Sequence, residues 1–186
     1  MLGHVLLSHG SESGPEAIKI SALASVAEAL GWQVTRPDYR DLDARGELAC
    51  IDPRIARLKQ QVRRGERLVL GGSSMGSFVS GLASLDLDCA GLFLLALPLE
   101  ISGYERAFDG ARVPLTIVHG WDDELCPASE VVAFARRRRA DLVMVHDTHR
   151  LAESVDFLAA QFRLFLQEVA MQEHDRDEAN AVVVDG

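Results

Sequence analysis

Cysteine is scarce in this sequence, which has three in 186 residues, at positions Cys50, Cys89 and Cys126. The odd count, the wide spacing and the lack of a Cys-x-x-Cys pair argue against a disulfide framework and a structural zinc site. Long hydrophobic runs are also missing, because the apolar stretch at the N-terminus is too short for a signal peptide or a spanning helix. We therefore expect a protein of the reducing cytoplasm that carries no membrane address.

Positive charge is in deficit as well, since the formal net charge is −9. Phosphate binding depends on clustered Lys and Arg, so nucleic acid is not expected as a partner. The local exception is the run of four arginines at 136–139. Four consecutive residues point all around a helix, so we interpret the run as a solvated helix end near the negative pole of the helix dipole. A site for an anionic substrate or partner is the alternative.

The sequence does have the material for one domain, because 48% of its residues are hydrophobic. Short apolar runs alternate with amphipathic segments, which is typical of βαβ units. Strands are expected at 5–8, 33–36, 67–71, 91–97, 113–118 and 142–145. Helices are expected at 15–30, from 53 to about 64, from the glycine-rich turn at 71–76 to about 85, at 129–138 and from 151 to about 171. The pattern predicts an α/β fold with a doubly wound, mainly parallel six-stranded sheet.

Two further segments are predicted to lie outside regular structure. Residues 38–50 are polar and are expected to form a loop, after which Asp52-Pro53 reads as an N-cap with proline in the first helical position. Residues 172–186 are acidic and lack aromatic side chains. We predict a domain over 1–171 and a mobile tail over 172–186.

Chemistry is indicated first by Gly72-Ser73-Ser74-Met75-Gly76, a G-x-S-x-G pattern between an apolar strand and a helical pattern. A serine on so sharp a turn needs very small residues two positions before and after it. The turn raises Oγ above the sheet at a helix N-terminus, where the next N–H can bind an oxyanion. The flanking glycines centre on Ser74 rather than on Ser73, so we predict Ser74 as a nucleophile.

A serine hydroxyl needs a base to take its proton and an acid to orient that base. The strand expected at 113–118 is followed by three acids, Asp122, Asp123 and Glu124, and the strand at 142–145 is followed by His146 and His149. Ligand sites of such sheets lie at the carboxyl ends of the strands. The chain order serine, acid, histidine is that of the α/β-hydrolase arrangement.

The sequence resembles the α/β-hydrolase superfamily, in particular its small lidless bacterial esterases and thioesterases. Four blocks carry the resemblance: Leu7-Ser8-His9-Gly10, the serine block, His119-Gly120 through Asp123 to Pro127, and His149-Arg150-Leu151. The family pattern H-G-x-x-D-x-x-x-P implies Asp123, rather than Asp122, as the catalytic acid. The family's histidine precedes the final helix, which implies His149, rather than His146, as the base.

The resemblance also implies an oxyanion hole formed by the backbone N–H groups of Met75 and Ser11. For His9, a purely structural role that braces the loop is an equal alternative to a direct one. We interpret His119 as structural. Ser77 stands where many relatives have a second glycine, and we expect it to tighten the packing of its helix against the sheet. A possible substrate pocket is expected from the following residues: His9, Phe78, Leu99, Tyr104 and Trp121.

No insertion is long enough for a cap domain, because residues 98–110 provide the only room over the site. We see no metal-ligand spacing and no phosphate-binding loop, so neither a metal nor an organic cofactor is expected. The expected function is hydrolysis of a small-molecule carboxylic ester or thioester through an acyl-enzyme. The alternative is a binding protein on the same scaffold, since a fold does not give a function. A lyase or haloperoxidase activity on the same three residues is a more distant option.

Overall fold

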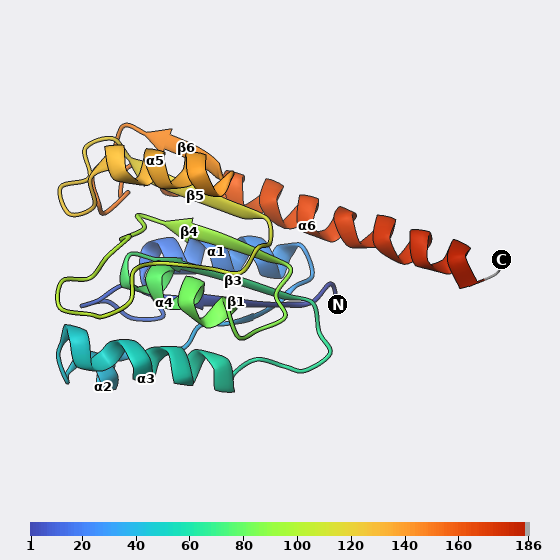
Figure 1. Cartoon of the computed structure of the whole chain (residues 1–186), viewed down its shortest axis with the longest axis horizontal. Coiled ribbons are helices and arrows are strands. Elements are labelled where there is room, and N and C mark those ends of the chain that lie inside the picture. Colours follow the sequence, from blue (N-terminus) through green and yellow to red (C-terminus); the bar gives the residue numbers. More distant parts are fainter. Residues whose placement is uncertain (185–186) are drawn as a thin grey trace.

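A computed structural model describes the backbone of residues 1–184 and the side chains of residues 1–172. Six strands form one sheet with the order β2-β1-β3-β4-β5-β6, and every neighbouring pair is parallel (Figure 1). The strands are β1 His4–Ser8, β2 Gln33–Thr35, β3 Leu68–Ser73, β4 Gly91–Leu95, β5 Leu115–Gly120 and β6 Asp141–Val145. The predicted doubly wound sheet is therefore confirmed, and the described sheet is parallel throughout.

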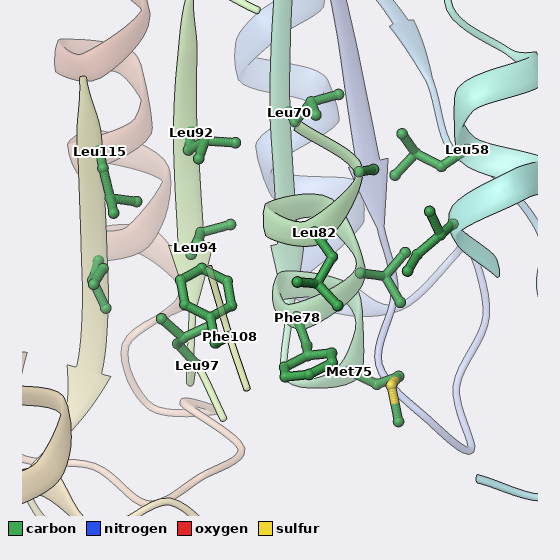
Figure 2. Packing of buried hydrophobic residues seen from close by; sticks show 14 of the residues in the cluster. Leu58, Leu70, Met75, Phe78, Leu82, Leu92, Leu94, Leu97, Phe108 and Leu115 are labelled. Atoms are coloured by element: carbon green, nitrogen blue, oxygen red, sulfur yellow. The ribbon is translucent and has the colours of Figure 1, made fainter. Parts of the chain in front are cut away.

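Helices cover both faces of this sheet (Figure 1). They are α1 Ile18–Ala29, α2 Arg40–Asp43, α3 Glu47–Gln60, α4 Met75–Ser84, α5 Ala128–Arg138 and α6 Val155–Val184. Side chains of a strand alternate between the faces: Leu68 and Leu70 of β3 pack with α3, α4 and α5, whereas Val69 packs with α1 and α6. Figure 2 shows the first of these cores, in which Leu92 and Leu94 of β4 lie against Phe78 and Leu82 of α4. Helix α4, which follows the sharp turn at Ser74 and is called the elbow helix below, is buried along its whole length.

The segment predicted as a loop before Asp52 differs most from expectation. It contains α2, and α3 begins at Glu47, so Pro53 lies inside α3 rather than at its start. Cys50 packs in a small buried cluster with Tyr39 and Leu42. Burial of this face extends the helix upstream of the proline, and tertiary contacts thus override the local capping signal.

The opposite end of the chain also differs from expectation. The final helix begins at Val155, four residues later than predicted, and continues to Val184. Residues 185–186 lie outside the described residues, as do the side chains of 173–184. The division into a domain and a mobile tail therefore stays a prediction.

Nothing in the described chain forms a cap domain over the sheet. The segment after β4, where the sequence left room for one, is irregular from 96 to 114. Among the described helices, none combines the length and the apolar character that crossing a membrane requires.

Candidate active site

Ser74 forms the turn between β3 and α4 and has a φ of 54° and a ψ of −121°. A non-glycine residue in this region is strained, and such strain is held only where the surroundings fix it. The glycines on both sides permit the turn, because a Cβ on Gly72 would overlap the backbone of Gly76, and one on Gly76 would overlap the carbonyl of Ser8. Ser77 is fully buried, and its Oγ lies 2.8 Å from the carbonyl oxygens of Gly72 and Leu95. It thus ties α4 to β3 and β4, as the sequence predicted.

Three side chains that are far apart in the sequence meet at the carboxyl edge of the sheet. Asp123 follows β5, His149 follows β6, and Ser74 follows β3. His149 Nδ1 lies 2.9 Å and 3.0 Å from the two carboxylate oxygens of Asp123, and His149 Nε2 lies 2.8 Å from Ser74 Oγ. Because the carboxylate can only accept, Nδ1 carries the proton and Nε2 accepts the Ser74 hydroxyl hydrogen. Of the alternatives, Asp122 and His146 are exposed and Ser73 is buried in β3, and none of the three belongs to this hydrogen-bond chain.

The Asp123 carboxylate is stabilised by its own loop. Its Oδ1 accepts the N–H groups of Leu125 at 2.9 Å and Cys126 at 2.7 Å. Burial raises the pKa of this carboxyl, but the hydrogen bonds from His149 and from the Cys126 N–H outweigh burial, so that its pKa lies below the ordinary value. His119 is fully buried, and its Nε2 is 2.8 Å from the Cys126 carbonyl oxygen. It therefore holds the loop that carries the acid, and the same nitrogen lies 3.4 Å from Asp123 Oδ2.

The ligand atoms of Asp123, Cys126 and His149 all lie within 4.8 Å of one another, a spacing that a metal ion could bridge. The chemistry of the group fits a metal poorly. Burial and neighbouring carboxylates raise the pKa of the Cys126 thiol to about 12, and a metal ligand must be a thiolate. Both nitrogens of His149 already have hydrogen-bond partners in the described structure.

The loop after β1 lies against the nucleophile. A Cβ on Gly10 would lie 3.5 Å from the Cβ of Ser74 and 3.3 Å from the Ser73 carbonyl oxygen. Ser11, the next residue, is exposed to solvent. On the other side of Ser74, the N–H of Met75 is the first of α4, so the helix provides no carbonyl for it. The two predicted oxyanion donors therefore belong to segments that flank the Ser74 side chain.

The sequence and the fold both have known counterparts. A family model described as an alpha/beta hydrolase domain matches residues 2–155. The chain belongs to the α/β-hydrolase superfamily. Among solved structures, a protein of Xanthomonas campestris assigned to the alpha/beta superfamily of hydrolases is 44% identical, with a TM-score of 0.85 over 89% of this chain and 99% of that one. No curated protein matches the sequence.

Two more distant structures share the fold of this α/β-hydrolase. Est1E from Butyrivibrio proteoclasticus is 20% identical, with a TM-score of 0.69 over 90% of this chain and 88% of Est1E. A lidless α/β serine hydrolase from Xanthomonas campestris is 18% identical, with a TM-score of 0.65 over 88% of this chain and 81% of that one. The resemblance to small α/β-hydrolases that the sequence indicated is thus confirmed, and membership supports hydrolase activity in general.

The residues predicted to line a pocket have different surroundings in this hydrolase. His9 and Phe78 are completely buried, the first in the loop after β1 and the second in the core. Tyr104 packs edge-on against Phe78 and donates its hydroxyl to Asp52 at 2.6 Å, and Trp121 is half exposed. Leu99 lines a small cavity of about 100 Å³ next to the Asp123 loop. A cavity of about 530 Å³ lies at the opposite edge of the sheet, where β3, β4 and β5 begin.

Sequence reasoning missed two residues that hold the His149 loop of the hydrolase. Asp147 is buried and accepts hydrogen bonds from Thr148 N–H at 2.8 Å and from the Ser154 hydroxyl at 2.8 Å. Lys19 of α1 donates to the Arg150 carbonyl at 2.5 Å, and burial lowers the pKa of this lysine to about 8. Asp147 also accepts the Glu153 N–H, so its partners lie one, six and seven residues further on, a spacing that matches no turn pattern in the sequence. Lys19 offered no local signal.

Proposed function

We propose that the protein is a serine hydrolase that cleaves a carboxylic ester or thioester through an acyl-enzyme on Ser74. The observation that carries the proposal is the unbroken hydrogen-bond chain from the Asp123 carboxylate through His149 to Ser74 Oγ, with distances of 2.9 Å and 2.8 Å. A base within this reach can take the hydroxyl proton as the bond to carbon forms. The lowered pKa of Asp123 supports its part, because a carboxylate that stays ionised stabilises the imidazolium.

The reaction proceeds in two steps, acylation of Ser74 and hydrolysis of the acyl-enzyme. In the first, His149 Nε2 takes the Ser74 proton while Oγ attacks the carbonyl carbon, and the Met75 and Ser11 N–H groups bind the developing oxyanion. The bond to the alcohol or thiol then breaks, and the imidazolium gives its proton to the leaving group. In the second step a water molecule, deprotonated by the same nitrogen, attacks the acyl carbon. The acid leaves, and Ser74 regains its proton.

A matched pair of serine variants tests the proposal. A fluorophosphonate probe should label the wild-type protein once per chain, and p-nitrophenyl acetate should be hydrolysed with an initial burst. Ser74→Ala should abolish both signals, whereas Ser73→Ala, which alters the buried neighbour in β3, should retain both. A folded wild-type protein that is neither labelled nor active would overturn the proposal and favour a binding protein on the same scaffold.

The cavity beside the Asp123 loop favours a short, uncharged acyl group. It is lined by Leu97, Leu99, Cys126 and Val131 together with two acidic residues, Glu100 and Glu130. Leu97 also belongs to the core cluster that contains Met75 and Phe78 of α4 (Figure 2), and the cavity itself lies between the segment after β4 and the loop that carries Asp123. Its volume of about 100 Å³ is less than the roughly 150 Å³ in which an apolar cavity holds benzene. A chain of about four carbons therefore fits, and a carboxylate is repelled.

An ester series checks this preference. We expect kcat/KM to be about tenfold or more higher for p-nitrophenyl butyrate than for p-nitrophenyl octanoate. We expect the same difference between the butyrate and a p-nitrophenyl succinate monoester. Leu99→Trp, which fills the cavity, should reduce the butyrate rate and leave the acetate rate nearly unchanged. A rate that rises steadily with chain length would contradict the assignment of this cavity to the acyl group.

A further inference from the structure

We infer that Arg54, held by Asp43, is a positioning residue that aims the Ser11 N–H at the substrate oxygen. The inference rests on the proposed function and extends it to a helix that contributes nothing to the Ser74, His149 and Asp123 chain. No sequence motif drew attention to either residue. The structure connects both of them to the loop after β1, which carries the second expected oxyanion donor.

Arg54 of α3 is a charged side chain with no exposed surface. Burying a guanidinium is costly unless its donors are satisfied by partners of suitable geometry. Its Nε donates to Asp43 Oδ1 at 2.7 Å, and one terminal nitrogen reaches Asp43 Oδ2 at 2.5 Å. Its face lies 4.6 Å from the centre of the Tyr39 ring. The group is therefore fixed in one orientation.

The remaining donors of Arg54 point at the loop after β1. One terminal nitrogen donates to the His9 carbonyl at 2.8 Å and the other to the Gly10 carbonyl at 3.2 Å. The Gly10 carbonyl is held by two more donors, the Ser13 hydroxyl at 3.0 Å and His9 Nδ1 at 2.8 Å. His9 can donate from Nδ1 because its Nε2 accepts the Tyr39 N–H at 3.0 Å. Burial lowers the pKa of His9, which keeps the ring in this neutral form.

Holding the Gly10 carbonyl fixes the direction of the next N–H. The peptide unit is planar, and in a trans peptide the C=O and the following N–H point in opposite directions. No peptide bond in the described chain is cis. Since Arg54, Ser13 and His9 bind the Gly10 oxygen from one side, the Ser11 N–H must point to the other side. A Cβ on Gly10 would lie 3.5 Å from the Ser74 Cβ, so the Gly10–Ser11 peptide lies next to the nucleophile, and we infer that its N–H faces the space where a substrate oxygen binds.

Arginine is the residue that this geometry requires. Its planar fork supplies donors in two directions at once, to a carboxylate on one edge and to two carbonyls on another. A lysine at the same position has one nitrogen and cannot reach Asp43, His9 and Gly10 together. The conservative change Arg54→Lys therefore keeps a buried positive charge but removes the alignment.

The chain offers a matched control one turn further along α3. Arg57 forms a two-bonded pair with Asp41 of α2, at 2.5 Å and 2.8 Å, and donates to the Asp38 carbonyl at 2.6 Å. The pair connects the same two helices as Arg54 and Asp43 but lies on the surface, with the Asp41 side chain 60% exposed. The hydrogen bonds and the ion pair of Arg57 in the described structure go to Asp38 and Asp41 and not to the loop after β1. A variant that disrupts this pair therefore tests the connection between α2 and α3 without altering the hydrogen bonds that orient the Ser11 N–H.

The experiment measures kcat and KM for p-nitrophenyl butyrate together with inhibition by a trifluoromethyl ketone, whose adduct with serine carries an oxyanion. We expect Arg54→Lys to lower kcat by about 10²-fold, the effect of losing one oxyanion donor, with KM changed less than about threefold. The inhibition constant should rise by the same factor as kcat falls. Arg57→Lys should leave all three values unchanged.

Asp43→Asn is the second variant, because it keeps the size of the side chain and only weakens the anchor of Arg54. It should lower kcat about tenfold. A variant that folds, as judged by circular dichroism, and retains wild-type kcat and ketone affinity would overturn the positioning role. A wild-type protein without turnover or fluorophosphonate labelling would overturn the proposed function instead, so the two failures are distinct.

Discussion

At the scale of single residues, Gly76 of the elbow helix lies directly against the backbone at the end of β1. Any Cβ there would overlap the Ser8 carbonyl and lie 2.7 Å from the His9 carbonyl oxygen. Both obstacles are backbone, so they cannot move aside as a flexible side chain would. We expect Gly76→Ala to destabilise the protein by about 3 kcal/mol or more.

Urea denaturation measures this loss, and Gly65→Ala is the control. Gly65 has a φ of +79°, but a Cβ added there would meet no atom of the described chain within 4 Å. Only the cost of about 1–2 kcal/mol for a left-handed backbone therefore applies. Equal stabilities for the two variants would show that the close approach of α4 to the backbone of Ser8 and His9 does not require glycine at position 76.

Asp123 gives a prediction for pH dependence. Its pKa is lower in the folded protein than the value of about 3.9 expected when unfolded, because hydrogen bonds to the carboxylate outweigh burial. The folded state thus binds its proton less readily, and stability from this group is fully present above about pH 4. It is lost as the pH falls through the lowered pKa. Asp123→Asn should therefore cost about 1–3 kcal/mol at neutral pH and progressively less in acid.

Urea midpoints at several values from pH 7 down to pH 3 follow this difference. Asp122→Asn, at the exposed neighbouring position, should show no such convergence with the wild type. A gap between wild type and Asp123→Asn that widens on acidification would mean that the carboxyl group is protonated more easily in the folded protein.

At the scale of elements, α3 contains a proline at its seventh residue. Proline there supplies no N–H to the carbonyl of Ala49 one turn earlier and crowds it. We expect Pro53→Ala to stabilise the protein by about 1–2 kcal/mol, which is the helix gain reduced by the greater entropy of the unfolded chain. Pro98→Ala, in the irregular segment after β4, is the control and should bring no gain in the urea midpoint. A loss of stability in Pro53→Ala would contradict this account of α3.

The elements that were predicted correctly are those with strong local signals. The β3 and β4 runs are apolar on both faces because helices cover both, and they read as buried strands without any partner in view. The start of α3 was missed because Asp52-Pro53 resembles an N-cap, and only packing of Cys50 with Tyr39 and Leu42 extends the helix upstream. Local sequence thus fixes an element's type more firmly than its ends.

The residues of the candidate site also differ in how well the sequence predicts them. Ser74, Asp123 and His149 each follow a strand within a recognisable turn, so their convergence at one sheet edge could be predicted. Arg54 and Asp43 are eleven positions apart, on segments that were predicted as a helix and a loop, respectively. Their burial depends on how α2 and α3 pack over the loop after β1, which no local pattern encodes. Residues that align a reactive group are therefore harder to predict than residues that react.

At the scale of the whole molecule, the boundary between domain and tail depends on what α6 buries. The aromatic and aliphatic side chains of this helix that pack on the sheet and on α1 end at Val169 and Ala170. Met171 is 68% exposed, and Gln172 is exposed as well. The family model ends earlier still, at residue 155. Among the described side chains, those of the core therefore end at about residue 170.

Truncation tests this boundary. A chain that ends at Gln172 should match the full chain in kcat/KM and lie within about 0.5 kcal/mol of it in urea denaturation, because it keeps every buried side chain of the described core. A chain that ends at Leu164 also loses Phe165, Leu166 and Val169, which are at most 4% exposed. Each such loss costs about 2–4 kcal/mol, so the three together cost about 6–12 kcal/mol, which is comparable to the whole margin of roughly 5–15 kcal/mol. A marked loss of stability or activity in the longer of the two truncated chains would show that residues 173–186 belong to the folded domain and are not a tail.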